Sequence, residues 1–151
     1  MRKNLPVTNQ RKTFNPEQRL ISVTDTKGII TDCNDAFVQI SGFSRAELIG
    51  QPHNIVRHPD MPPLAYQIMW EHLKAGRPWM GLVKNRSKNG DYYWVDAYVT
   101  PVTEGGRVVG YESVRSCPAR ACSCSTSRPT TSTSTRFSGW KAGWKVTPVP
   151  C

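Results

Sequence analysis

Three runs of alternating apolar and polar residues between positions 79 and 115 place the strongest constraint on the fold. The runs cover residues 79–86, 92–102 and 107–115. The dipeptides Asn89-Gly90 and Gly105-Gly106 separate them, and both favour tight turns between antiparallel strands. The pattern predicts an antiparallel meander of three strands, and such a sheet needs other elements to cover at least one of its faces.

Two shorter runs rich in β-branched residues precede the meander, at residues 20–25 and 28–33. Thr26 and Lys27 separate them, so the pair predicts a β-hairpin. Because strands occur at both ends of this region, the intervening residues 34–78 have to supply whatever covers the sheet.

Helical signals fill that interval. Asn34 or Asp35 can cap a short helix that ends at Gly42, since each side chain can accept a hydrogen bond from a free backbone amide. Ser44 and Glu47 have the spacing of a capping box, which predicts a second short helix.

A longer helix is predicted to begin at Pro62 and Pro63 and to end before Gly76. Its apolar face repeats at helical spacing through Tyr66, Met69, Trp70 and Leu73. The order of two strands, helices and three strands predicts an α+β domain, with a five-stranded antiparallel sheet and short helices packed on one face.

Composition divides the chain into three parts. Residues 1–19 are polar and basic, and we expect a partly flexible cap there. Residues 20–116 hold the periodic pattern. In residues 117–151, Ser, Thr, Pro and Cys fill 20 of 35 positions and Asp and Glu are absent. Such a segment cannot build a core, so we expect it to be disordered or translated out of frame.

The net charge of +9 does not predict nucleic-acid binding, because residues 117–151 carry +5 of it and no nucleic-acid-binding motif is present. The spacing of the five cysteines does not match a zinc site. The sequence has neither a secretory signal nor an apolar run long enough to span a membrane, so we expect a cytoplasmic location.

The loop before the long helix is the strongest candidate site. It contains His53, Arg57, His58 and Asp60 within eight residues. Imidazole, guanidinium and carboxylate groups together can hold a polar or anionic ligand through charge-assisted hydrogen bonds. A second interpretation stays open at this point, in which Arg57 and Asp60 pair across their own turn and only brace the loop.

Several long segments together resemble a PAS domain and, more narrowly, the N-terminal sensory PAS domain of bacterial aerotaxis receptors. The resemblance covers residues 18–115 and includes the stretch Val56-Arg57-His58-Pro59-Asp60-Met61-Pro62. Matches of this length are more specific than a short motif. The tail after Ser116 is atypical, because family members continue there into a charged helical linker.

The resemblance implies a PAS fold and a non-covalently bound FAD whose redox state reports oxygen or electron-transport status during aerotaxis. It also implies a homodimer that acts with HAMP and methyl-accepting signalling domains on the chemotaxis kinase complex. Full-length relatives are anchored at the inner membrane, with this domain in the cytoplasm.

The predicted strand at 79–86 offers residues suited to a flavin ring. Alternation places Trp79, Gly81, Val83 and Asn85 on one face, where they would form an aromatic wall, a gap and an amide for the polar edge of the ring. Core packing of Trp79 and a strand-end role for Asn85 are the competing interpretations. The other face carries Met80 and Leu82, which could form an outer apolar patch with Trp94 and Tyr98.

We therefore predict eight cofactor-binding residues. Arg57 and His58 would grip the cofactor. Asp60 would orient one of them or accept a hydrogen bond from a ribose hydroxyl, and His53 would support them. Asn34 and Tyr66 are included because the family places pocket residues near them; unaided, they are a helix cap and a core aromatic. Trp79 and Asn85 complete the set.

Three alternatives remain. A PAS module without a cofactor could serve only in dimerisation or docking, since fold alone does not establish a ligand. Haem binding through His72 is possible in principle, but that residue lies off the apolar helix face. No nucleophile and base occur at plausible spacing, so we do not expect an enzyme.

Overall fold

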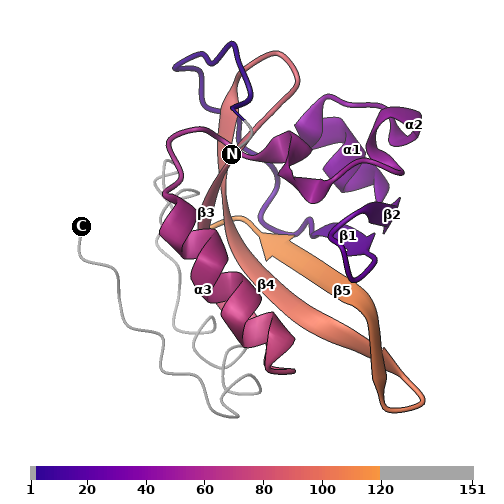
Figure 1. Ribbon diagram of the computed structural model, residues 1–151. Coiled ribbons are helices and arrows are strands. Elements are labelled where there is room, and N and C mark those ends of the chain that lie inside the picture. Colours follow the sequence, from indigo (N-terminus) through magenta and orange to yellow (C-terminus); the bar gives the residue numbers. More distant parts are fainter. Residues whose placement is uncertain (1–2, 120–151) are drawn as a thin grey trace.

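A computed structural model describes residues 3–119 and shows a five-stranded antiparallel sheet with its helices on one face (Figure 1). The strands are β1 (Leu20–Thr24), β2 (Ile30–Cys33), β3 (Trp79–Arg86), β4 (Tyr92–Glu104) and β5 (Arg107–Ser116). Their order across the sheet is β2-β1-β5-β4-β3. The predicted α+β class, hairpin and meander are confirmed. The predicted tail, from residue 120 onward, lies outside the described residues.

The helices are α1 (Asp35–Ser41), α2 (Arg45–Leu48) and α3 (Pro63–Lys74). They begin where the side chains predict: Asn34 accepts a hydrogen bond from the amide of Phe37, and Ser44 and Glu47 form the capping box. The sequence pattern missed a single 3-10 turn, η1 (His53–Val56), inside the region expected to be a loop. A four-residue turn has too few positions to show a helical period.

The first and last strands of the sheet region are hydrogen-bonded to each other, which brings the hairpin next to the meander. β1 pairs with β5 in antiparallel register, from Leu20 opposite Arg115 to Thr24 opposite Tyr111. Gly110 permits this close approach, because a Cβ atom there would lie 2.1 Å from the carbonyl oxygen of Thr24. The pairing places β1, η1 and β5 around one space.

The core lies between the sheet and the helices. Its largest fully buried side chains include Leu20, Phe37, Leu48 and Tyr93. Along β4, the buried residues alternate with more exposed ones, as expected for a sheet covered on one face. Met80, Leu82, Trp94 and Tyr98 lie on the opposite face of the sheet, since they alternate with the buried positions and Met80 pairs with Tyr98.

Residues 3–19 contact both the β3–β4 turn and the loop that follows α2. The amide of Thr8 donates to the carbonyl of Gly90, and the backbone of Tyr92 exchanges hydrogen bonds with residues 10 and 12. The buried side chain of Asn4 donates to the carbonyls of Asn54 and Arg57, at 2.9 and 2.8 Å. This segment therefore links the sheet to the η1 loop.

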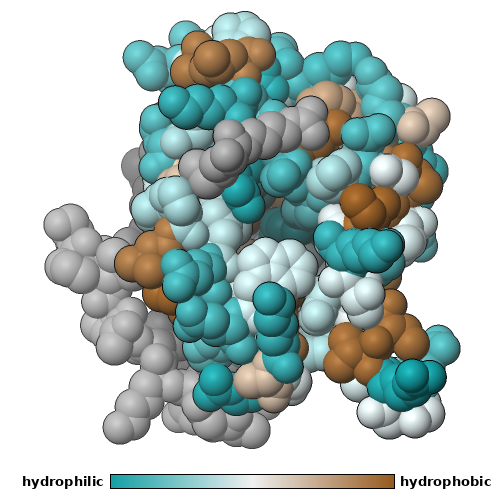
Figure 2. Space-filling view, viewed as in Figure 1, coloured by the Kyte–Doolittle hydropathy of each residue, from teal (hydrophilic) through white to brown (hydrophobic). Residues whose placement is uncertain are grey.

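Within residues 3–119, no helix is long and apolar enough to cross a membrane. The face viewed in Figure 2 is largely hydrophilic, and its apolar residues form separate small patches. Large apolar side chains are exposed singly or in pairs, as at Leu64 and Ile68 on α3. Scattered residues of this kind are ordinary on protein surfaces.

Candidate functional site

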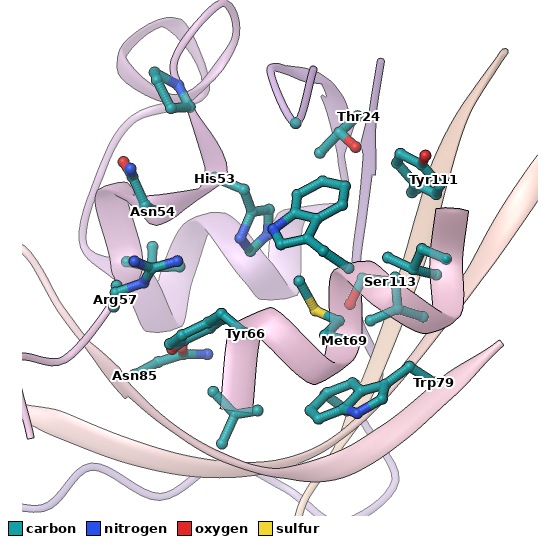
Figure 3. A pocket seen from close by; sticks show the side chains of 18 of the residues that line it. Thr24, His53, Asn54, Arg57, Tyr66, Met69, Trp79, Asn85, Tyr111 and Ser113 are labelled. Carbon is teal, nitrogen blue, oxygen red and sulfur yellow. The ribbon is translucent and has the colours of Figure 1, made fainter. Parts of the chain in front are cut away.

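A pocket of about 380 Å³ lies between α3, η1 and the inner face of the sheet (Figure 3). Its volume is in the range of small-molecule sites. Twenty residues line it, contributed by the β1–β2 region, η1, α3 and strands β3, β4 and β5. Segments far apart in the sequence therefore converge on one space.

The walls of the pocket are largely apolar and aromatic. The predicted face of α3 supplies Tyr66, Met69, Trp70 and Leu73. The predicted inner face of β3 supplies Trp79, Val83 and Asn85. Gly81 is different: a Cβ there would lie 2.6 Å from the Trp79 indole, so the expected gap above Gly81 is filled by this ring.

Five polar side chains on the pocket wall each have a buried polar atom without a hydrogen-bond partner. These atoms are Asn54 Oδ1, Arg57 Nε, Tyr66 Oη, Asn85 Nδ2 and Ser113 Oγ. A buried polar atom left unpaired costs about 1 to 3 kcal/mol. A ligand with both donors and acceptors along its edge would satisfy several of them, so the wall fits a flat, largely apolar ligand with a polar rim.

Arg57 lies at the end of the pocket that also contains Tyr66 and Asn85 (Figure 3). Its guanidinium stacks 3.8 Å from the centre of the Tyr66 ring. Burial raises the pKa of the Tyr66 phenol, and the charge of Arg57 acts in the opposite direction. Arg57 also forms a backbone bridge with Asn85, which ties the η1 loop to β3.

His53 belongs to a buried polar cluster. Its Nε2 atom lies 2.6 Å from Arg115 Nη2 and 3.0 Å from Ser22 Oγ. Burial and the positive charge of Arg115 hold the pKa of His53 well below its usual value. Because guanidinium only donates, Nε2 of this neutral imidazole accepts the bond and Nδ1 carries the proton.

His58 and Asp60 do not line the pocket. The buried ring of His58 packs edge-on against Tyr92, and its Nδ1 accepts from the amide of Asp60. The carboxylate of Asp60 is 66% exposed and pairs with Lys84 at 2.8 Å. The alternative pairing of Asp60 with Arg57 is therefore wrong, because the neighbouring strand β3 supplies a closer cation. His58 and Asp60 fix the shape of the turn that carries Arg57.

Asn34 also lies outside the pocket. Besides capping α1, its side chain accepts from the amide of Ile21 and donates to the carbonyl of Arg19. It fastens the start of α1 to the strand β1. Of the eight predicted residues, the structure brings together five around the pocket: His53, Arg57, Tyr66, Trp79 and Asn85.

The prediction missed three pocket residues on β5, namely Tyr111, Ser113 and Arg115. They alternate along the strand, so period-two analysis alone could have placed them on one face. What the sequence could not show is which face is the inner one, because that depends on the pairing of β5 with β1.

His72, the residue on which the haem alternative depends, is not among the residues that line the pocket. Separately, residues 3–119 contain no group of three or more His, Cys, Asp or Glu side chains that could hold a metal ion.

Comparison with known protein families identifies the fold. The model of the PAS fold matches residues 30–115. This chain belongs to the PAS fold family. The match covers η1, α3 and nearly all of strands β3 to β5, whereas β1 and the β1–β2 turn, which also border the pocket, precede it.

The curated relatives include the aerotaxis receptor of Escherichia coli, which is 52% identical over 109 residues, or 72% of this chain. The nitrogen fixation regulatory protein of Klebsiella pneumoniae is 38% identical over 54% of the chain. The chain spans only 22% and 17% of the lengths of these two relatives. The predicted resemblance to the PAS domain of aerotaxis receptors is confirmed.

Solved structures show the same fold at low sequence identity. The LOV domain of the blue-light photoreceptor aureochrome 1, in its light state, has a TM-score of 0.63 and 20% identity, covering 68% of this chain and 84% of that one. A PAS domain from Colwellia psychrerythraea has a TM-score of 0.56 and 24% identity, covering 68% and 87%. Both structures share the PAS fold of this chain.

Proposed function

We propose that this PAS domain binds FAD non-covalently and senses oxygen or redox status through the oxidation state of the flavin. The observation that carries the proposal is the pocket wall, where five unpaired buried polar atoms border apolar and aromatic surface. An isoalloxazine ring presents flat apolar faces and a polar edge with donors and acceptors, which matches such a wall.

Of the residues that the structure describes, three cationic ones, Lys27, Arg57 and Arg115, line the pocket, and no Asp or Glu does. This charge balance favours a ligand that carries phosphate, as FAD does. In the proposed arrangement, Arg57, Tyr66 and Asn85 supply hydrogen bonds, and Trp79 supplies an aromatic wall. His53 supports the site through its contact with Arg115.

The predicted residues outside the pocket would act indirectly. His58 and Asp60 hold the backbone of the turn that positions Arg57. Asn34 holds α1 against β1, next to the hairpin that borders the pocket. We propose that these three residues position the site without contacting the cofactor.

A route for the signal runs through β3. The side chains of Val83 and Asn85 face the pocket, whereas Met80 and Leu82 of the same strand face the other side of the sheet. Reduction changes the hydrogen bonds that the flavin edge donates and accepts. A rotated Asn85 amide would then shift β3 and alter the outer surface.

The similarity to the aerotaxis receptor supports a role in aerotaxis signalling. On this proposal, residues 20–116 form the sensory domain, residues 1–19 form its cap, and the domain acts in the cytoplasm as a homodimer. Its output would pass to HAMP and methyl-accepting signalling domains and from them to the chemotaxis kinase complex.

Substitution of Asn85 tests the proposed site. Asn85→Leu keeps a similar volume but removes the unpaired donor, so the affinity for FAD should fall by about tenfold or more. Asn89→Leu is the matched control, because Asn89 is exposed in the β3–β4 turn. Each purified chain is titrated with FAD and with FMN. The quenching of flavin fluorescence on binding gives the affinity.

The titrations have three informative outcomes. Tighter binding of FAD than of FMN supports the dinucleotide. Equal affinities for the Asn85→Leu and Asn89→Leu chains would remove Asn85 from the site. A folded wild-type chain that binds neither flavin would contradict the proposal and leave a PAS module that acts by docking or dimerisation.

A further inference from the structure

Arg115 is a buried cation that has no carboxylate partner among residues 3–119. Its side chain lines the pocket, and the residue is only 4% exposed. The ion pairs formed by residues 3–119 involve Arg45, His58, Lys84 and Lys88, and Arg115 is not among them. Such an arrangement is costly, because a charge removed from water is normally paired.

Within the described part of the chain, the hydrogen bonds of the Arg115 guanidinium go to neutral groups. Nη1 donates to Ser22 Oγ at 3.0 Å, and Nη2 donates to His53 Nε2 at 2.6 Å. The Cζ atom lies 5.2 Å from the centre of the Phe37 ring. Burial lowers the pKa of Arg115 to about 10, which still leaves the group protonated at neutral pH.

Among the described residues, the neighbouring side chains do not neutralise the charge of Arg115. His53 cannot neutralise it, since an imidazole contributes no negative charge. The acidic groups that act on Arg115 are the phenols of Tyr66 and Tyr93, and burial raises the pKa of each. Among residues 3–119, the pocket wall therefore carries a fixed positive charge that an anionic ligand would offset.

We propose that Arg115 makes the pocket bind a flavin more tightly when its isoalloxazine ring is reduced and negatively charged than when that ring is oxidised and neutral. This inference rests on the proposed function. Transfer of two electrons and one proton from an external electron carrier leaves the flavin ring with one negative charge. A buried cation on the wall stabilises that form and leaves the neutral ring almost unaffected. Arg115 would thus set the redox level at which the sensor responds.

The test compares the midpoint potential of bound FAD in wild type, Arg115→Gln and Arg115→Lys. Gln keeps hydrogen-bonding capacity but removes the charge, whereas Lys retains the charge. Arg115→Gln should lower the preference for reduced over oxidised flavin by roughly tenfold or more, seen as a lower midpoint potential. Arg115→Lys should stay close to wild type. Potentials are measured by anaerobic titration with dithionite and reference dyes.

A second measurement needs no substitution and covers the case in which Arg115→Gln does not fold. The wild-type chain should bind reduced FAD more tightly than oxidised FAD, so its midpoint potential should exceed that of free FAD. A bound potential at or below the free value would overturn the inference.

The outcomes separate the two proposals. Equal potentials for wild type and Arg115→Gln, with FAD bound to both, would overturn the role of Arg115 and leave flavin binding standing. A wild-type chain that takes up no FAD would overturn both.

Discussion

Two buried histidines of this domain lie next to positively charged side chains. His53 lies against Arg115, near Arg57, and stacks on Phe37 with ring centres 5.8 Å apart. His58 is also buried, next to Lys84 and Arg86. Burial and these cations lower the pKa of both histidines below the usual 6.5.

Stability should therefore fall as the solution becomes acidic. The unfolded chain binds protons at its histidines below about pH 6.5, whereas the folded chain resists protonation until lower pH. The full contribution is present above pH 6.5. Between the unfolded and folded pKa values, each histidine removes up to about 1.4 kcal/mol per pH unit from the free energy of unfolding.

Urea unfolding between pH 5 and 7 measures this dependence. His53→Gln should flatten the decline by removing the contribution of one histidine. His72→Gln is the control, because His72 lies outside the pocket and the buried cluster. If the free energy of unfolding declines as steeply with falling pH in His53→Gln as in wild type, His53 does not cause the decline.

On β3 and α3, the sequence predicted which side chains face the pocket. Trp79 and Asn85 follow from strand alternation, and Tyr66 from helical spacing together with the family resemblance. Arg115 escaped notice because an inward-facing arginine breaks the pattern on which a core prediction depends. Its inward position follows from the β1–β5 pairing, which is a long-range contact.

At the level of secondary structure elements, the cap and the η1 loop act on each other. The Asn4 side chain is the link, since it donates to two carbonyls of the loop that carries His53 and Arg57. Local sequence gave no sign of this contact, because the two segments lie about fifty residues apart. The helix caps, by contrast, were predictable, since each depends on residues three positions apart.

Removal of the Asn4 side chain should loosen the loop and speed the loss of FAD. Asn4→Ala leaves two carbonyls without their donors, at a cost of roughly 1 to 3 kcal/mol. The dissociation rate of FAD, followed by fluorescence recovery after dilution, should rise by about fivefold or more. Asn9→Ala is the matched control, because Asn9 is exposed in the same segment.

Equal dissociation rates for Asn4→Ala and Asn9→Ala would contradict a role of the cap in holding the loop. A fall in the free energy of unfolding without any change in dissociation would give Asn4 a role in folding only.

For the molecule as a whole, one sheet separates the pocket from the outer surface. The helices lie on the inner face of the sheet (Figure 1). Met80, Leu82, Trp94 and Tyr98 lie on the outer face. Fold class was predictable because hydrophobic periodicity is local. The strand order was not, since it depends on which strands meet across the sheet.

On the proposed function, this separation lets one domain bind a ligand on the inner face and present a signal on the outer one. A change in hydrogen bonding at Asn85 would act on β3, whose residues Met80 and Leu82 face the other side of the sheet. The strands β3, β4 and β5 are hydrogen-bonded along most of their lengths, so a shift in one is transmitted to its neighbours.

Whether the pocket holds a flavin is tested by the visible absorption spectrum of the purified chain after incubation with FAD and removal of unbound ligand. We predict the two absorption bands of oxidised flavin, with about one FAD released per chain on heating, and reversible bleaching on reduction and re-oxidation. A folded chain that remains colourless after this treatment would contradict the central claim that the pocket holds a redox-active flavin.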